Sequence, residues 1–426
     1  MLNRPADRHW RCTVNAAREV IESRLGRIEF TALVSMIMAV TALAIDMMLP
    51  AFGAMRPDFG LSADSNALAP IVTFFLVGLA LGQLVWGPLS DALGRKGILY
   101  AGLAVYIVGA VGAALAPSLP ALFALRFLGG VGAAGPRVVA LGLVRDVYEG
   151  EAMAKAMSYI MAVFIAVPIV APTLGSLILA AGSWHLVFWV IALFAGVVGV
   201  WSIRLPETLS PDRRLPLKIE RLLDATRFVF RNRLTMGLTL SRTAVFGFFA
   251  SYLASSQLII DQVFDLDAWF PVIFGGSAAV IGIGMLINTQ LLELVPLRTL
   301  LGWIARGYVL ATSAFAIIAW STGGTPAFGL FLAGLLPILM CHALLIPNFH
   351  AAAMIPMGDV AGTASAVTGT IGTLGGAVLG AVIDASFNGT IIPLATAGLI
   401  GSTIALVIYV WADRAWDDHS EFTAAQ

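Results

Sequence analysis

The sequence predicts an all-α integral membrane protein with twelve transmembrane helices in two six-helix bundles. Three observations lead to this fold class: the composition, the length of the apolar runs, and the placement of the cations. Of the 426 residues, 59% are hydrophobic and 12% are charged, and the mean hydropathy is +0.90. Soluble domains carry roughly 25% charged residues. So few charges cannot cover the surface of a water-soluble protein of this length.

Twelve apolar runs are long enough to cross the roughly 30 Å of hydrocarbon in a bilayer. We expect spans at 30–52, 67–88, 97–116, 120–143, 153–180, 184–204, 234–257, 268–290, 299–320, 325–347, 360–384 and 390–411. A polar central loop, 206–233, separates an N-terminal bundle (29–205) from a C-terminal bundle (234–412). Two halves of equal span number suggest an internal repeat.

The cations predict the orientation of these spans, because Lys and Arg concentrate in cytoplasmic loops. With the N-terminus inside, the inner segments hold most of them, including Arg95, Lys96, Arg145 and the basic central loop, whereas the outer loops hold only Arg56. Residues 1–28 are then a retained cytoplasmic leader and residues 413–426 a cytoplasmic tail, since the leader lacks the apolar core of a secretory signal. The expected location is the bacterial inner membrane.

Several function classes are disfavoured because the sequence lacks the features that they require. The net charge is zero, so no basic field suggests nucleic acid as a partner. Cys12 and Cys341 give no disulfide framework, and no set of residues has metal-ligand spacing. No lysine lies in a phosphate-binding glycine-rich loop, so ATP hydrolysis is not expected. We expect no cofactor, and transport driven by a gradient or running downhill.

Charges inside spans are expensive and mark functional sites by default. Asp46 lies late in the first span and Arg126 early in the fourth, which places them at a similar depth. A carboxylate and a guanidinium at matched depth could pair across a cavity, which lowers the cost of burying both. Asp46 would then exchange a proton as substrate competes for the pair. The alternative is a permanent structural ion pair.

Arg137 lies about three turns deeper in the fourth span than Arg126, and its partner is open. Glu29 at the inner end of the first span is one candidate, and a snorkel toward phospholipid is the other. Arg242 and Arg306 lie near the inner ends of their helices, where snorkelling suffices. The remaining polar groups in the spans are interpreted as packing or wet end residues: His342, Asn348, His350 and Asp384.

The short charged segment 87–97 joins the second and third spans. A helix is expected to end near Asp91 and the chain to turn at Gly94, with Arg95 and Lys96 in water. Asp146 ends the fourth span on the same membrane face. Asp91, Arg95 and Asp146 could therefore form a cytoplasmic gate that clamps helix ends, whereas a plain solvated turn would only set topology. Gly87, Gly94 and Lys96 complete the predicted gate.

The fifth span carries Pro168 and Pro172 four residues apart, so they share one helix face and could bend the helix twice. Gly175 continues that face and allows close approach of a neighbouring helix. An ordinary kinked packing helix would explain the same residues.

These motifs together resemble the major facilitator superfamily. The segment Gly87–Gly97 resembles its loop between spans two and three, Arg126 its span-four signature, and Pro168–Gly175 its antiporter signature in span five. The segment Ile45–Ala51 is similar to one of the Bcr/CflA-like branch of drug:proton antiporters, although Ile45 and Met48 depart from that pattern. The resemblance implies the major facilitator fold, with substrate held between the two bundles.

The resemblance also implies proton-driven export of apolar or amphipathic compounds, that is, multidrug efflux and antibiotic resistance by alternating access. In that interpretation Asp46 carries the proton, Arg126 tunes it, and the partners are a small-molecule substrate, protons and the bilayer. We expect a monomer. A proton symporter or uniporter for a specific metabolite is the alternative. A membrane-embedded enzyme is disfavoured because the spans hold no convergent catalytic set.

Overall fold

The computed structural model describes the chain except for residues 1–20, 22, 149, 212–213, 215–218 and 417–426. Most of the predicted leader, part of the central loop and most of the tail therefore lie outside the described residues. The described residues are helical and include no strand. Among them, twelve helices are long and apolar enough to cross a membrane. The fold class and the number of spans are thus confirmed.

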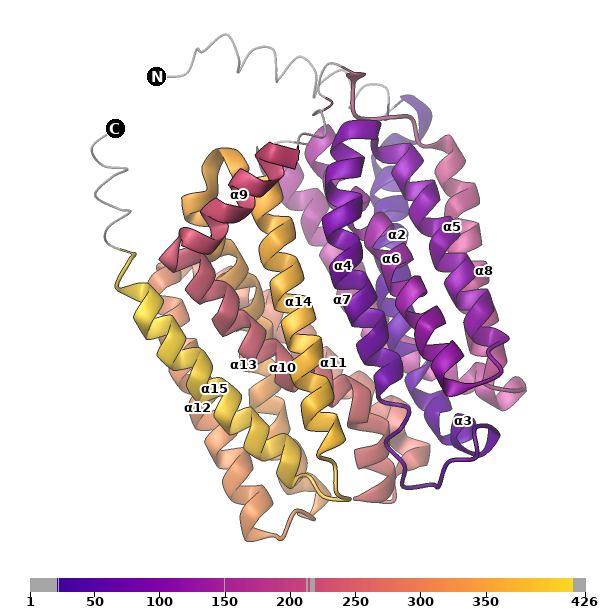
Figure 1. Cartoon of the computed structure of the whole chain (residues 1–426). Helices are drawn as coiled ribbons and strands as arrows, with labels where there is room; N and C mark the ends of the chain where they lie inside the picture. Colours follow the sequence, from indigo (N-terminus) through magenta and orange to yellow (C-terminus); the bar gives the residue numbers. More distant parts are fainter. Residues whose placement is uncertain (1–20, 22, 149, 212–213, 215–218, 417–426) are drawn as a thin grey trace.

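The first half of the chain supplies six long helices: α2 (Gly26–Asp46), α4 (Pro70–Leu93), α5 (Arg95–Ala114), α6 (Leu119–Val147), α7 (Gly150–Ala181) and α8 (His185–Trp201). The second half supplies six more: α10 (Arg233–Gln262), α11 (Phe270–Leu294), α12 (Leu297–Ser321), α13 (Phe328–Met354), α14 (Ala361–Ala385) and α15 (Ile392–Asp413). In Figure 1 the two sets form two bundles that stand side by side.

Two helix pairs make the most extensive packing between the bundles. On one side α4 packs along α14, where the Thr370 hydroxyl donates a hydrogen bond of 2.9 Å to the Ala80 carbonyl. On the other side α7 packs against α11, with Gly275 next to the backbone of Ile169. The outward faces carry large apolar side chains, such as Val200 and Leu310, which are 68% and 73% exposed. Such an apolar exterior suits lipid rather than water.

The first span departs from the predicted 30–52. Helix α2 ends at Asp46, and the chain continues through a short 3-10 turn (Leu49–Ala51) into α3 (Phe52–Asp58). Pro50 explains the break, because proline lacks the N–H that a continuing helix needs and fits the first turn of a new one. The break places Asp46 at a helix end.

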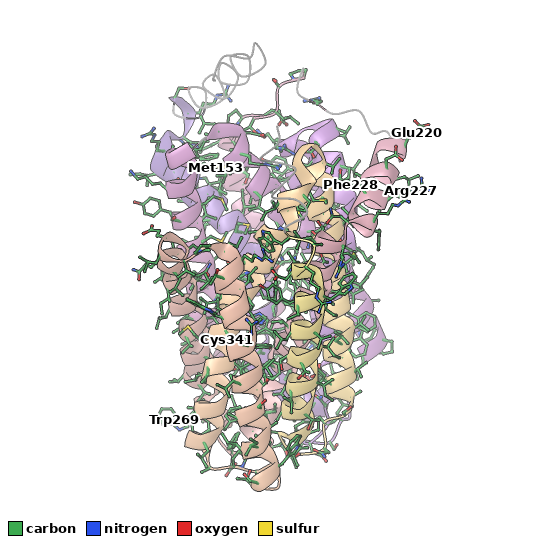
Figure 2. The ribbon with its side chains drawn as sticks, turned by 90° about the vertical axis from the view of Figure 1, so that its left-hand side faces the viewer. Met153, Glu220, Arg227, Phe228, Trp269 and Cys341 are labelled. Atoms are coloured by element: carbon green, nitrogen blue, oxygen red, sulfur yellow. The ribbon has the colours of Figure 1, made fainter. Side chains whose placement is uncertain are left out.

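The predicted central loop contains an amphipathic helix, α9 (Ile219–Arg231). Its Val229 is buried against Met357, which precedes α14, and against Ala364 and Val367 in the first turns of α14. In Figure 2, Glu220, Arg227 and Phe228 on α9 lie at the opposite end of the molecule from Trp269. We call these two ends of the bundle the α9 end and the Trp269 end.

Candidate functional site

A buried ion-pair network occupies the α9 end of the first bundle. Helix α4 ends at Leu93, and Arg95 is the first residue of α5. Arg95 Nη1 lies 2.6 Å from Asp91 Oδ1, and Arg95 Nε lies 2.9 Å from Asp146 Oδ2 at the end of α6. Nη1 also donates to the Ser90 hydroxyl over 2.9 Å. The predicted cluster of Asp91, Arg95 and Asp146 is therefore present.

The prediction that Arg95 lies in water is wrong. Arg95 is only 4% exposed. Burial of a guanidinium is tolerated when carboxylates and hydroxyls satisfy its donors, and removing one partner leaves an uncompensated charge. Lys96 is half-buried instead, with Nζ donating to the Ile203 carbonyl over 2.9 Å. A side chain at Gly87 would touch Ala366 of α14, so this end of the motif faces the second bundle.

Glu207 and Thr208, beyond α8, extend the network and were missed by the sequence reasoning. The Glu207 carboxylate accepts hydrogen bonds from the backbone N–H groups of Arg95 and Lys96, at 2.9 and 3.2 Å. A carboxylate at a helix N-terminus satisfies donors that the helix leaves free. The Thr208 hydroxyl donates to Asp146 Oδ2 over 3.0 Å. Gly94 has φ +106°, and a side chain there would collide with Glu207.

Asp46 is the last residue of α2 and is 5% exposed. Within the part of the chain that the structure describes, its carboxylate has no hydrogen bond or ion pair. The predicted pairing with Arg126 is therefore absent there, although both residues are buried.

Arg126 contacts the Asp46 helix through the backbone instead. Its Nη2 donates to the Ala44 carbonyl over 2.9 Å, and its guanidinium lies 4.4 Å from the ring centre of Phe75 and 5.8 Å from that of Phe188. The last carbonyls of a helix lack helical partners, which explains the acceptor. Aromatic faces stabilise a desolvated cation. Sequence spacing gave the depth of the two side chains but not the break that frees the Ala44 carbonyl.

Pro168, Pro172 and Gly175 all lie within α7. Gly175 packs against the carbonyl oxygen of Met47, and a side chain there would collide with it. The predicted close helix approach is thus seen, and its partner is the break that follows Asp46. The bends at the two prolines remain a prediction.

Arg137 has neither of its predicted environments. Glu29 accepts a hydrogen bond from Trp201 Nε1 over 3.0 Å and pairs with Arg204 at 2.7 Å. Arg137 is instead close enough to Arg242 and His350 of the second bundle for their charges to interact. Arg242 does not snorkel either, since its Nη1 contacts His350 Nδ1 at 3.2 Å. The charges of the two arginines thus act on each other across the two bundles.

The comparison with known proteins identifies the family. The family model described as Major Facilitator Superfamily matches residues 34–380, which is most of the chain. The chain belongs to the major facilitator superfamily. It is 27% identical over 363 residues to an uncharacterized MFS-type transporter, YdgK, of Bacillus subtilis, covering 84% of this chain and 89% of that one.

A second relative points to the drug-export branch. The chain is 26% identical over 366 residues to a bicyclomycin resistance protein homolog of Haemophilus influenzae, covering 82% of this chain and 87% of that protein. Among solved structures, a D-xylose-proton symporter matches with a TM-score of 0.70 at 13% identity, over 88% of this chain and 97% of that one. The relative from Bacillus and this structural neighbour are transporters by name, and the drug-resistance name of the Haemophilus relative is consistent with the resemblance to Bcr/CflA-like exporters.

Asp384 is the functional candidate in this major facilitator fold that sequence reasoning placed wrongly. It was interpreted as wet, but it is only 6% exposed. Its Oδ1 accepts hydrogen bonds from the hydroxyls of Ser251 and Ser255, both at 2.6 Å, while Oδ2 is buried without a partner. The two serines lie four residues apart on α10 and so share one face. The spacing of these two serines is the sequence feature from which a polar partner on another helix could have been predicted.

The Asp384 region also joins the two bundles at the Trp269 end. Asn66, before α4, donates to the Asp384 carbonyl over 2.8 Å beside a cavity of about 340 Å³. Arg56 of α3 donates to Gln257 of α10 over 2.9 Å and lies 3.7 Å from Asp261. Polar contacts between the bundles thus hold this end together.

Proposed function

We propose that this chain is a proton-coupled antiporter that exports small apolar or amphipathic compounds by alternating access. The transporter class follows from the family, and the drug-resistance relative supports efflux. Proton coupling and antiport are part of this proposal. The energy source would be the proton gradient, with no cofactor and with the monomer as the working unit.

One observation carries the proposal: the buried carboxylate of Asp46 beside the packed junction of α2 and α7. A buried ionised carboxylate without a paired cation is costly, so its charge depends on what occupies the neighbouring space. Arg126 is anchored nearby, since its Nη2 donates to the carbonyl of Ala44, two residues before Asp46. Entry of an amphipathic compound changes the surroundings of this carboxylate, so binding of the compound and binding of a proton are linked.

The membrane placement is part of the proposal. We infer a bacterial inner membrane with the α9 end in the cytoplasm, because that end carries Arg95, Lys96, Arg227 and Arg231. Both termini would then be cytoplasmic. Attaching a reporter that is active only in the cytoplasm to either end of the chain checks this, and activity after fusion to an outer loop instead would overturn it.

Reconstitution into liposomes tests the coupling. With an imposed pH gradient, efflux of a drug such as chloramphenicol from wild-type vesicles should collapse the gradient, and Asp46→Asn should abolish this coupled proton movement. Arg306→Gln is the matched control, since Arg306 is exposed and donates to the Gly302 carbonyl. Full coupling in the Asp46→Asn variant would refute the role of Asp46. Solute and proton moving in the same direction would favour the metabolite symporter.

A further inference from the structure

Arg137 and Arg242 lie at matched depth on helices of the two different bundles. Arg137 lies ten residues before the end of α6 and Arg242 nine residues after the start of α10. At 1.5 Å per residue, both are about 15 Å from the α9 end of their helices. Transporters of this architecture bind substrate near the bilayer midplane, at the interface between the repeats. The pair therefore lies where a transported compound is expected.

The side chains around Arg242 place nitrogen donors toward the same space. Because a guanidinium only donates, His350 Nδ1 accepts from Arg242 Nη1 over 3.2 Å, and His350 Nε2 then donates to the Ser365 hydroxyl over 3.3 Å. Arg242 Nε is buried without a partner. Gly372 of α14 makes room for the guanidinium, since a side chain there would press on it.

Other buried donors in this region also lack partners. Gln83 Nε2 on α4 has none, although its Oε1 lies against Gly369 of α14. His342 is 5% exposed, and its Nδ1 has no partner either. The His342 ring stacks on Phe249 at 4.4 Å between centres, with Phe246 at 6.4 Å. Unsatisfied polar groups are costly in a low-dielectric interior, so these nitrogens are available to hydrogen-bond a polar group of a bound compound.

No acidic side chain balances these cations among the described residues. The charges that act on Arg242 and His350 are those of arginines: Arg137 on Arg242, and both arginines on His350. The ionisable groups facing the site are Arg137 from α6, Arg242 from α10, and His342 and His350 from α13. Helix α4 adds Gln83 and α14 adds Ser365, both neutral. Two guanidinium groups held together without an anion repel each other.

We propose that Arg137 and Arg242 bind a carboxylate of the transported compound, with Phe246 and Phe249 packing against its apolar part. This rests on the proposed function as an exporter and narrows its substrates to amphipathic carboxylates. Arginine is suited to the task because its planar fork donates two parallel hydrogen bonds to a carboxylate. One carboxylate between both arginines relieves their repulsion and joins the two bundles across the substrate.

Binding measurements on the purified full-length chain in neutral-lipid nanodiscs test this without any gradient. The probes are phenylbutyrate, phenylbutanol and phenylbutylamine, which share one apolar group and differ in charge. For the wild type we expect phenylbutyrate to bind at least about tenfold more tightly than phenylbutanol, because charge-assisted bidentate bonds are the strong ones. Phenylbutylamine should bind most weakly, since it adds a third cation.

Variants assign the preference to the two arginines. Arg137→Gln and Arg242→Gln should each remove the preference for phenylbutyrate while phenylbutanol binding changes little. Arg242→Lys should keep part of it, because charge is retained and the fork is lost. Arg306→Gln is the control and should bind like the wild type.

Equal binding of phenylbutyrate and phenylbutanol by the wild type would overturn the proposal. An undiminished preference for phenylbutyrate over phenylbutanol in both Arg242→Lys and Arg137→Gln would also overturn it. These two variants therefore test the proposal even if Arg242→Gln fails to fold. The antiport proposal fails in a different assay, through retained coupling in Asp46→Asn. A lost carboxylate preference with intact coupling, or the reverse, therefore separates the two.

Discussion

Gly175 of α7 packs directly against the main-chain carbonyl of Met47, the residue after Asp46. The helix that carries the antiporter-like prolines therefore touches the break at which α2 ends. A shift of α7 along its axis would displace the backbone that holds Asp46. The contact gives the fifth span a physical route to the buried carboxylate.

Replacing Gly175 by alanine should disturb this junction. The added methyl group collides with a backbone atom rather than with a flexible side chain, and overpacking of this kind costs about 1–3 kcal/mol. We expect a lower thermal midpoint in detergent and reduced drug efflux in vesicles. Gly196→Ala on α8 is the control, since a side chain there meets nothing. Equal thermal midpoints and equal efflux in Gly175→Ala and Gly196→Ala would contradict a role for the contact between Gly175 and Met47.

The Arg95 network predicts a large stability effect at the α9 end. Arg95→Gln leaves Asp91 and Asp146 without their cation, and breaking a buried pair costs about 3–5 kcal/mol. Thermal unfolding of the purified protein, followed by intrinsic fluorescence, measures it. Lys96→Gln removes a neighbouring, half-buried cation and should change the midpoint little. If the segment were a plain turn that only sets topology, Arg95→Gln and Lys96→Gln would have the same thermal midpoint.

Glu207 should stabilise the start of α5. Removal of a side-chain cap costs about 0.5–2 kcal/mol, so Glu207→Ala should lower the midpoint less than Arg95→Gln does. Hydrogen exchange of the amides of Arg95 and Lys96, which the carboxylate caps, should speed up. Glu293→Ala removes an exposed carboxylate beside another helix end and is the comparison. Unchanged protection at those two amides would show that Glu207 does not cap them.

Asp384 should respond differently to asparagine and to alanine. Asparagine keeps an Oδ1 acceptor for the hydroxyls of Ser251 and Ser255, whereas alanine leaves both hydroxyls unpaired. Each buried unsatisfied group costs about 1–3 kcal/mol. Asp384→Ala should therefore unfold at a clearly lower temperature than Asp384→Asn. If Asp384→Ala and Asp384→Asn unfold at the same temperature, the hydrogen bonds from the two serines do not stabilise the fold.

The sequence predicted the fold well because its signals are long and redundant. Twelve apolar runs and an uneven cation distribution each extend over the whole chain, so an error of a few residues at one end does not change the result. Local patterns also predicted the turn at Gly94, which lies between α4 and α5, but they did not predict the burial of Arg95.

The candidate site was less predictable because its contacts join distant segments. Glu207 reaches Arg95 across more than a hundred positions, and no spacing rule connects them. Asp46 and Arg126 were expected to pair, but Arg126 instead reaches the carbonyl of Ala44, two residues before Asp46, and spacing alone does not distinguish these two acceptors. Arg137 and Arg242 were treated as separate helix residues, and only the packing of the two bundles brings them together.

The polar contacts at the two ends of the molecule have different partners, and this has a consequence for the energy of motion. At the α9 end, the Arg95 network lies inside the first bundle, which it locks into one body. At the Trp269 end, Arg56 and Asn66 reach across to Gln257 and Asp384 in the second bundle. Separating the bundles there breaks directional bonds, and water must replace each of them. Separation of the two bundles at the Trp269 end should therefore have an enthalpic barrier. It should also be cooperative, because these hydrogen bonds must break together.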